Sequence, residues 1–423
     1  MQINPLNLAL FSFFHHDVTG YIDFPITKSH EWLKITQAPV SKDESNILHV
    51  IKNIISETLH LSGDGKVAIT LTGGFDSRVV LAALLHFGVK PICVTYGDQR
   101  NRDIQISRKI AEHFGLKHYN VAAKTPTAEW YEHWINKTIE IDGGNAHLHR
   151  AHRTAAIAEL LEKEKIEVLF TGHLGGENIR GLSYNDYFAS PLFENVNEGK
   201  LSVKEAVNKE MKQYFLRPEK IDINEIYDCI ESLPWMSENK RNNKFFFVNE
   251  LVGNIHHRQD LRIYNHYIPK VVPLFMEDEY IETLCATKHH FLRKENLRFV
   301  ALQHPKLYCY LISRLFPDLM QFELSNGYAP VDYTKGIIYY TAKRIYQKKV
   351  KKIKNYPSFS HGSWYADWLK NRVEGIDDKI WEIYDEQAYK STLNSVSLQQ
   401  NEGFWHRFSN PLFFDLILKS NAY

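Results

Sequence analysis

The sequence predicts an α/β protein built on a doubly wound parallel sheet, with a mostly helical C-terminal region. Short apolar runs typical of strands alternate with segments of helical periodicity between residues 44 and 172. Strands and helices that alternate at this spacing imply right-handed crossovers and helices on both faces of the sheet. In such sheets ligands bind beyond the carboxyl ends of the strands, and two glycine-rich turns, TGGFDS and GHLGGE, follow two of these strands. We therefore expect both turns to face one crevice.

The individual elements follow from the spacing of the apolar residues. The expected strands span 67–71, 91–96, 118–121 and 168–172, and the expected helices span 44–61, 76–87, 103–114, 127–139 and 150–164. From about residue 182 the alternation stops, and the remaining chain is rich in aromatic residues and interrupted by prolines. This predicts an N-terminal segment (1–44), an α/β domain (45–310) and a helical C-terminal region (311–423).

The bulk composition excludes several classes of protein. A formal net charge of +1 over 423 residues gives no overall attraction to nucleic acid or to an anionic membrane. The sequence has no uninterrupted apolar window of about 18 residues, so we expect no membrane partner. The cysteines form no CxxC pair and show neither a disulfide framework nor zinc-ligand spacing. Because the N-terminus also lacks the features of a signal peptide, we expect a cytoplasmic protein.

The first glycine turn lies in VAITLTGGFDSRVVLAALL, residues 67–85. Gly73 and Gly74 allow the backbone to turn tightly and to approach a ligand closely. The free amides at the start of the next helix favour an anion, and Thr72 and Ser77 can donate hydroxyl hydrogen bonds to phosphate oxygens. Asp76 would repel a bare phosphate, so its expected partner is a divalent cation that bridges it to phosphate. A plain strand-to-helix turn with a capping side chain is the alternative.

This turn resembles the SGGxDS signature of the ATP pyrophosphatase (PP-loop) superfamily. Within it, the chain is similar to the synthetase domain of asparagine synthetase and its relatives, the β-lactam synthetases and lasso-peptide cyclases. The similar segments are TYGDQRNRDIQISRKIAEHFGLKHYNV (95–121), VLFTGHLGGENIRG (168–181) and VVPLFMEDEYIETL (271–284). The resemblance covers roughly residues 45 to 310.

The resemblance implies a Mg-ATP-dependent ligase that forms AMP and pyrophosphate, adenylates a carboxylate and passes it to an amine. By motif, the residues that would bind pyrophosphate and Mg²⁺ are Thr72, Gly73, Gly74, Asp76 and Ser77. The residues that would lie against the adenosine are Thr95, Tyr96 and Gly97, and Gly172 would approach the α-phosphate or the acyl group.

The chain departs from the family at two positions that bear on catalysis. Where the family carries an Asp–Glu pair after the second glycine turn, this sequence has Gly176 and Glu177, so Glu177 is the candidate second Mg²⁺ ligand beside Asp76. His173 stands where relatives often have an acidic residue, and it could donate a hydrogen bond or contact a different substrate. The family's late catalytic lysine has one candidate, Lys335, and an exposed loop lysine is the alternative reading.

The expected substrates follow from the same resemblance. Asparagine synthetases begin with a glutaminase domain whose cysteine follows the initiator Met, whereas this chain has Gln2. The nitrogen is therefore expected from ammonia, a substrate amine or a separate amidase, and the acceptor is expected to be a small-molecule or peptide carboxylate in the synthesis of a specialised metabolite, peptide or polysaccharide. Two alternatives stay open: an RNA-modifying PP-loop enzyme that uses the basic run 342–356, and a nucleotide-binding protein that has lost catalysis.

Other polar clusters allow a functional and a structural reading. His256 and His257, with two nearby arginines at 258 and 262, could meet a substrate carboxylate or phosphate, or form a solvated or ion-paired helix face. His147 and His149 could line a substrate loop, and they could bind zinc only with further ligands that the sequence does not identify.

Overall fold

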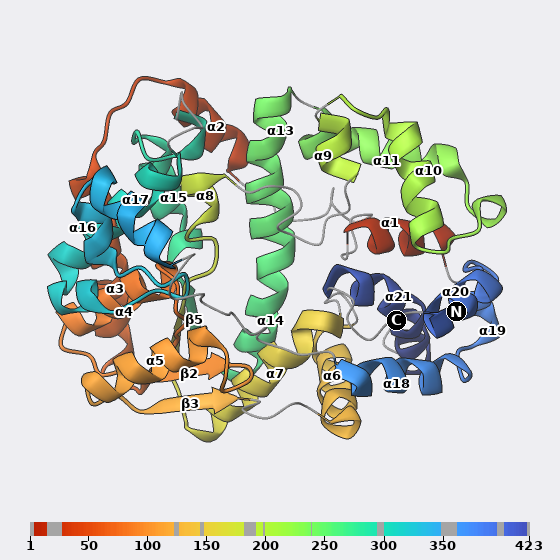
Figure 1. The fold of residues 1–423 in the computed structure, drawn as a ribbon, viewed down its shortest axis with the longest axis horizontal. Coiled ribbons are helices and arrows are strands. Elements are labelled where there is room, and N and C mark those ends of the chain that lie inside the picture. The colour runs from red at the N-terminus through yellow and green to blue at the C-terminus, as the bar shows by residue number, and fades with distance from the viewer. Residues whose placement is uncertain are drawn as a thin grey trace.

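The computed structural model describes residues 4–14, 28–121, 127–143, 148–181, 192–197, 199–237, 239–293, 300–347, 362–395 and 402–420. Its sheet has five parallel strands in the order β3-β2-β1-β4-β5 (Figure 1). The strands are β1 (Val67–Thr70), β2 (Ile92–Tyr96), β3 (His118–Val121), β4 (Val168–Thr171) and β5 (Lys270–Pro273). The predicted parallel sheet is confirmed. β5, the edge strand beside β4, is not among the strands expected from the sequence.

The strand order brings the two glycine turns together. β1 lies between β2 and β4, and Ile69 of β1 is paired with Phe170 of β4. Because neighbouring parallel strands end at the same edge of a sheet, the turns that leave β1 and β4 lie next to each other. The expected common crevice is therefore present.

Helices cover both faces of the sheet, as its alternating side chains require. On one face, Ile69, Cys93 and Phe170 belong to the main core, which includes apolar residues of α3 (Glu44–Ser62), α4 (Asp76–His86), α5 (Arg102–His113) and α16 (Val300–Leu315). On the other face, Ala68, Val94 and Leu169 pack with α7 (Leu148–Lys163) and α14 (Arg258–Tyr267). The side-chain period of two along each strand thus separates the two layers.

Local signals explain where the sheet helices begin. α3 starts at a capping box, in which the Asp43 carboxylate accepts a hydrogen bond from the Ser45 amide at 2.8 Å and the Asn46 side chain accepts one from the Asp43 amide at 3.0 Å. Asn101 caps α5 in a similar way by accepting from the Asp103 amide at 2.7 Å. These caps set the helix starts close to the positions that the sequence predicts.

A long helical rod stands between the sheet and a second group of helices (Figure 1). It consists of α13 (Lys240–Phe246), a π-helix (Phe247–His257) and α14 in direct succession. In the second group, α1 (Pro5–Phe14) packs on α11 (Ile223–Ser232) and on α21 (Glu402–Ser420), and α21 reaches α6 (Ala128–Asp142) and α7. Helices from all three predicted parts of the chain thus pack together, and the predicted boundary at residue 310 falls inside α16.

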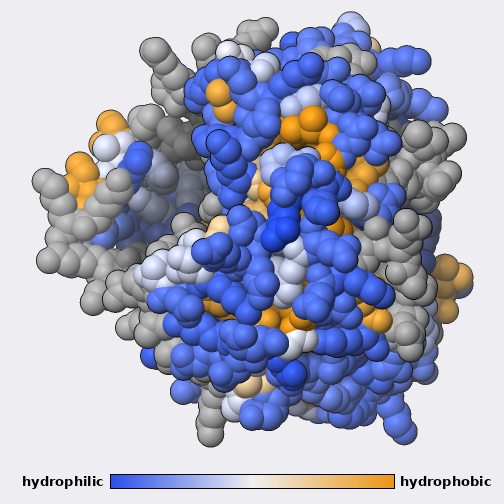
Figure 2. All heavy atoms as spheres, turned by 90° about the vertical axis from the view of Figure 1, so that its right-hand side faces the viewer, coloured by the Kyte–Doolittle hydropathy of each residue, from blue (hydrophilic) through white to orange (hydrophobic). Residues whose placement is uncertain are grey.

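The remaining helices complete the two groups. They are α2 (Ser29–Gln37), α8 (Glu177–Arg180), α9 (Leu192–Asn197), α10 (Val203–Gln213), α12 (Pro234–Ser237), α15 (Asp278–Cys285), α17 (Ile337–Tyr346), α18 (Gly362–Val373), α19 (Asp378–Trp381) and α20 (Glu386–Ser395). Figure 2 shows that the face on the right-hand side of Figure 1 is mainly hydrophilic, with apolar side chains in small separate groups. None of the helices within the described ranges combines the length and the hydrophobicity of a membrane span.

Candidate active site

A cavity of about 330 Å³ opens at the carboxyl ends of β1, β2 and β4. Its walls come from the ends of these strands, from the turn after β4 and from the facing sides of α7 and α14. The lining residues are Thr70, Leu71, Thr72, Asp76, Ser77, Val94, Thr95, Tyr96, Asp103, Arg153, Thr154, Ile157, Gly172, His173, Leu174, Glu177, His257, Asp260 and Tyr264. This is the position at which parallel α/β sheets bind ligands.

Hydrogen bonds hold the first glycine turn in one shape. The Thr72 amide donates to the Ser77 hydroxyl at 3.0 Å, and the two hydroxyl groups lie 3.1 Å apart. The Gly73 amide donates to the Asp103 carboxylate at 3.0 Å, and a Cβ atom at position 73 would lie only 2.6 Å from that oxygen. Gly73 is therefore required by the close approach of Asp103. Thr72 and Ser77 line the cavity, whereas Gly73 and Gly74 support the turn from outside the lining.

Asp76 begins α4 and is enclosed by the turn that follows β4. A Cβ atom at Gly175 would lie 2.7 Å from the Asp76 carboxylate, and one at Gly172 would lie 3.0 Å from the Ser77 amide. Glycine at both positions therefore lets the second turn close over the first. The Tyr308 hydroxyl, from α16, bonds to the Asp76 carboxylate and lies 2.6 Å from the Gly175 carbonyl oxygen.

The pKa of the Asp76 carboxyl group is strongly shifted. Burial, and next the negative charge of Glu177, raise the pKa of Asp76 to about 6 from 3.8, although the Tyr308 hydrogen bond and the charge of Arg180 act in the opposite direction. Glu177 is the first residue of α8 and is 9% exposed. The two carboxylates come from the ends of adjacent strands and repel each other in the absence of a cation. Such a pair of buried oxygen donors fits Mg²⁺, which prefers carboxylate and phosphate oxygens.

We expect Tyr308→Phe to weaken magnesium binding at pH 6.5 but not at pH 8. The hydrogen bond from the Tyr308 hydroxyl lowers the pKa of Asp76, so removing this hydroxyl raises the pKa of Asp76 further. If the pKa rises by about one unit, the ionised fraction falls roughly threefold at pH 6.5 and changes little at pH 8. Calorimetric titration of Mg²⁺ with ATP at both pH values measures this. Tyr310→Phe, on the same helix, is the matched control, and equal affinity of Tyr308→Phe and wild type at pH 6.5 would contradict the expectation.

The end of β2 forms the wall that the sequence assigns to the adenosine. The buried Thr95 hydroxyl donates to the Leu71 carbonyl oxygen at 2.7 Å and lies 2.9 Å from Nε2 of His118. Burial lowers the pKa of His118 to about 4, so this imidazole is neutral and donates from Nε2. Thr95 and Tyr96 line the cavity, whereas Gly97, at φ 128°, lies beyond the lining.

The structure places Lys335 away from the cavity lining. Its ammonium group lies 4.0 Å from the Asp332 carboxylate and 4.7 Å from the centre of the Tyr339 ring, and its side chain is 47% exposed. The preceding segment nevertheless reaches the first turn, because the Ser325 amide donates to the Gly73 carbonyl oxygen at 3.1 Å. A catalytic role for Lys335 stays a prediction.

The cavity also contains polar residues that the sequence analysis did not assign to it. Arg153 and Thr154 come from α7, and Asp260 and Tyr264 from α14. Tyr308 lies behind Asp76. No local pattern marks these residues, because each belongs to an ordinary helical period. The predicted substrate-loop residues His147 and His149 lie outside the residues and side chains that the structure describes, as does most of the basic run 342–356.

The histidines of the second turn and of the helical rod come together at the cavity. His173 follows β4, and its Nδ1 lies 2.8 Å from the Thr171 hydroxyl, while its Nε2 lies 3.6 Å from the Asp260 carboxylate. The rings of His173 and His257 have their centres 4.8 Å apart. No sequence pattern links His173 to His257, so their proximity was not predicted.

Part of the chain is similar to a known protein family. Residues 55–261 match the family model of asparagine synthase. The matched range contains β1 to β4 and all the residues that line the cavity except Tyr264. No curated protein matches the chain.

Proposed function

We infer that this protein joins a carboxylate to an amine with release of AMP and pyrophosphate. The inference starts from residues 55–261, which match the family model of asparagine synthase, a family of ATP-dependent ligases. The observation that carries the proposal is the pairing of Asp76 and Glu177 beside the rigid first turn. Burial, and next the negative charge of Glu177, raise the pKa of Asp76, and a bound divalent cation would offset the repulsion between the two carboxylates. Next to a turn lined with hydroxyl groups and amides, that cation would bind with the phosphates of a nucleotide.

The proposed reaction has two steps. A substrate carboxylate oxygen attacks the α-phosphorus of ATP, the bond to the β-phosphate bridging oxygen breaks, and an acyl-adenylate and pyrophosphate result. An amine then attacks the acyl carbon, AMP leaves, and the amine gives up a proton. Mg²⁺ would neutralise the charge that grows on the departing pyrophosphate.

The residues of the chain have separate tasks in this scheme. Asp76 and Glu177 would hold the cation, and Thr72 and Ser77 would donate to the pyrophosphate. Thr95 and Tyr96 line the cavity and would lie against the adenosine. Arg153 lines the same cavity, and its guanidinium would bind the incoming carboxylate.

A sharp test separates nucleotide binding from chemistry. Calorimetry with ATP and its α,β-methylene analogue, with and without Mg²⁺, is expected to show magnesium-dependent binding that Asp76→Asn removes. Exchange of labelled pyrophosphate into ATP is then screened with small carboxylic acids and peptides, because exchange requires the adenylate but no amine. Release of ADP and phosphate in place of AMP and pyrophosphate would overturn the proposal.

We expect Glu177→Gln to raise the magnesium concentration needed for half-maximal ATP binding by about tenfold or more, since one of two anionic ligands is lost. The same change removes the repulsion that raises the pKa of Asp76, so the acid limb of the pH profile is expected to move to lower pH. Glu167→Gln, an exposed position just before β4, is the matched control. An unchanged magnesium titration would show that Glu177 is not a ligand.

A further inference from the structure

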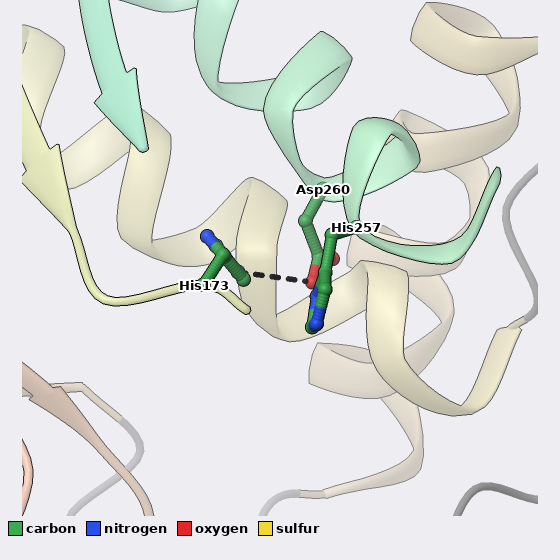
Figure 3. Close-up of side chains that lie close together, drawn as sticks. All are labelled: His173, His257 and Asp260. Atoms are coloured by element: carbon green, nitrogen blue, oxygen red, sulfur yellow. Dashed lines mark ion pairs between the residues drawn. The ribbon is translucent and has the colours of Figure 1, made fainter. Parts of the chain in front are cut away.

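Three side chains with nitrogen and oxygen donors converge on one side of the cavity. They are His173, from the turn after β4, and His257 and Asp260, from the helical rod (Figure 3). All three line the cavity. His257 and Asp260 are 4% and 7% exposed, so these polar groups are held inside the protein rather than on its surface.

The spacing of the donor atoms is that of metal ligands. His173 Nε2 and the Asp260 carboxylate oxygen are 3.6 Å apart, which is longer than a hydrogen bond. Two ligands of a metal at about 2.1 Å lie roughly 3.4 Å apart in tetrahedral geometry. One donor atom from each of the three residues lies within 4.8 Å of the others, so a small side-chain rotation closes the triangle.

Buried hydroxyl groups orient two of the three donors. Nδ1 of His173 lies 2.8 Å from the hydroxyl of Thr171, which leaves Nε2 to face Asp260. The Thr154 hydroxyl donates to the other Asp260 oxygen at 2.8 Å. Thr171 and Thr154 are 0% and 2% exposed. Outer partners of this kind fix the tautomer and direction of metal ligands.

The helical rod supplies the other two donors at a break in its geometry. His257 is the last residue of the π-helix and Asp260 lies in the first turn of α14, three positions later. Residues three apart lie on the same face of a helix. π-Helical segments are rare in proteins, but those that occur are often found at functional sites. This one ends where the donors face the cavity.

We propose that His173, His257 and Asp260 bind a divalent transition-metal ion, with Zn²⁺ as the first choice, at a site separate from Asp76 and Glu177. Two imidazoles and one carboxylate suit zinc, cobalt, iron or manganese, whereas Mg²⁺ prefers an all-oxygen site. Three protein ligands leave a position open toward the cavity, as in catalytic zinc sites. That position would take a nitrogen or oxygen atom of the acceptor, a role that rests on the proposed function, whereas the binding of the metal does not.

The test uses Co²⁺ as a coloured substitute for Zn²⁺. The full-length protein is stripped with a chelator and titrated with CoCl₂ in the absence of ATP. We expect the visible absorption of low-coordinate Co²⁺ to saturate at one equivalent and to be displaced by Zn²⁺. The same titration of Asp76→Asn is expected to give the same spectrum, because that variant changes only the magnesium carboxylates. A wild-type protein without this absorption would overturn the proposal.

Substitutions decide whether these residues are the ligands. His173→Ala, His257→Gln and Asp260→Asn are expected to weaken Co²⁺ binding more than about 100-fold, and Thr171→Val about 10- to 100-fold. His256→Gln, the neighbouring histidine outside the cluster, is the matched control. Circular dichroism checks the fold of each variant, and Thr171→Val keeps the test decisive if a ligand variant fails to fold. A cobalt spectrum that survives all four changes would overturn the proposal.

Separate readouts distinguish the two proposals. Co²⁺ binding without any Mg-ATP binding would leave the metal site standing and remove the ligase. Mg-ATP binding without a Co²⁺ spectrum would leave the proposed ligase standing and remove the metal site.

Discussion

Asp76→Asn is expected to abolish magnesium-dependent ATP cleavage and, at pH 7, to make the nucleotide-free protein more stable. The loss of a carboxylate that holds the cation should lower turnover by about two to three orders of magnitude or more. The gain in stability has a separate cause. Burial and the charge of Glu177 raise the pKa of Asp76 from 3.8 to about 6, so the ionised carboxylate is an unfavourable group in the folded protein.

The stability difference between Asp76→Asn and the wild type depends on pH. The raised pKa contributes stability below pH 3.8, and that contribution is lost as the pH rises through about 6. At pH 7 the unfolding free energy of the wild type is therefore about 1–3 kcal/mol lower than it would be with a neutral side chain at this position. The Asp76→Asn variant, whose asparagine does not ionise, avoids this loss. Denaturation by urea from pH 4 to pH 8 measures the difference, which should be small at pH 4 and reach a plateau above pH 6.5.

The control for Asp76→Asn is Asp64→Asn, an exposed aspartate shortly before β1. We expect it to change neither turnover nor stability by more than about 0.5 kcal/mol. An Asp76→Asn protein that still cleaves ATP would remove Asp76 from the magnesium site. One that is less stable than the wild type at pH 7 would show that the carboxylate is stabilised in the native protein by interactions stronger than its desolvation.

Arg78→Ala is expected to lower the free energy of unfolding by about 2–5 kcal/mol, because it leaves buried carbonyl groups without their donor. Arg78 is fully buried in α4, and its guanidinium donates to the carbonyl oxygens of Phe322 and Glu323, the second at 2.9 Å. Burial lowers the pKa of this guanidinium to about 9, which shows how strongly the site is desolvated.

The same substitution should also weaken ATP binding. Phe322 and Glu323 lie shortly before Ser325, whose amide donates to the Gly73 carbonyl oxygen, so Arg78 holds this segment against the first turn. Urea denaturation and calorimetry measure the two effects. Arg108→Ala, an exposed arginine of α5, is the matched control. A change in unfolding free energy below about 0.5 kcal/mol would contradict the role of Arg78.

The parts of the fold that could be predicted are those with local signals. The helices and strands around β1 to β4 follow from apolar spacing, and the first turn is formed by residues five positions apart, such as Thr72 and Ser77. Because the contact between Thr72 and Ser77 is short-range, the sequence pattern contains it, whereas the hydrogen bond from Gly73 to Asp103 spans 30 positions and is not marked by any local pattern. The neighbouring position of the two glycine turns could also be inferred, since it depends only on strands that end at one edge of the sheet.

The parts that could not be predicted depend on distant contacts. β5 is a four-residue strand that is exposed in part and lacks a long apolar run. Tyr308 occupies an ordinary position in α16, and only the tertiary structure directs its hydroxyl toward Asp76. His257 and Asp260 line the cavity where the rod changes from π to α geometry, and no residue pattern marks this change.

The bond between Tyr308 and Asp76 joins residues separated by 232 positions, and this separation affects how the chain folds. Closing loops of this length costs entropy before any contact repays it, so proteins with such topology fold slowly. Asp76 acquires its Tyr308 partner only when α16 is docked against α4. A nucleotide that binds only the native state would, at 100 times its dissociation constant, add about 2.7 kcal/mol to the unfolding free energy of the protein. Substrate availability would then govern the lifetime of the polypeptide as well as its turnover.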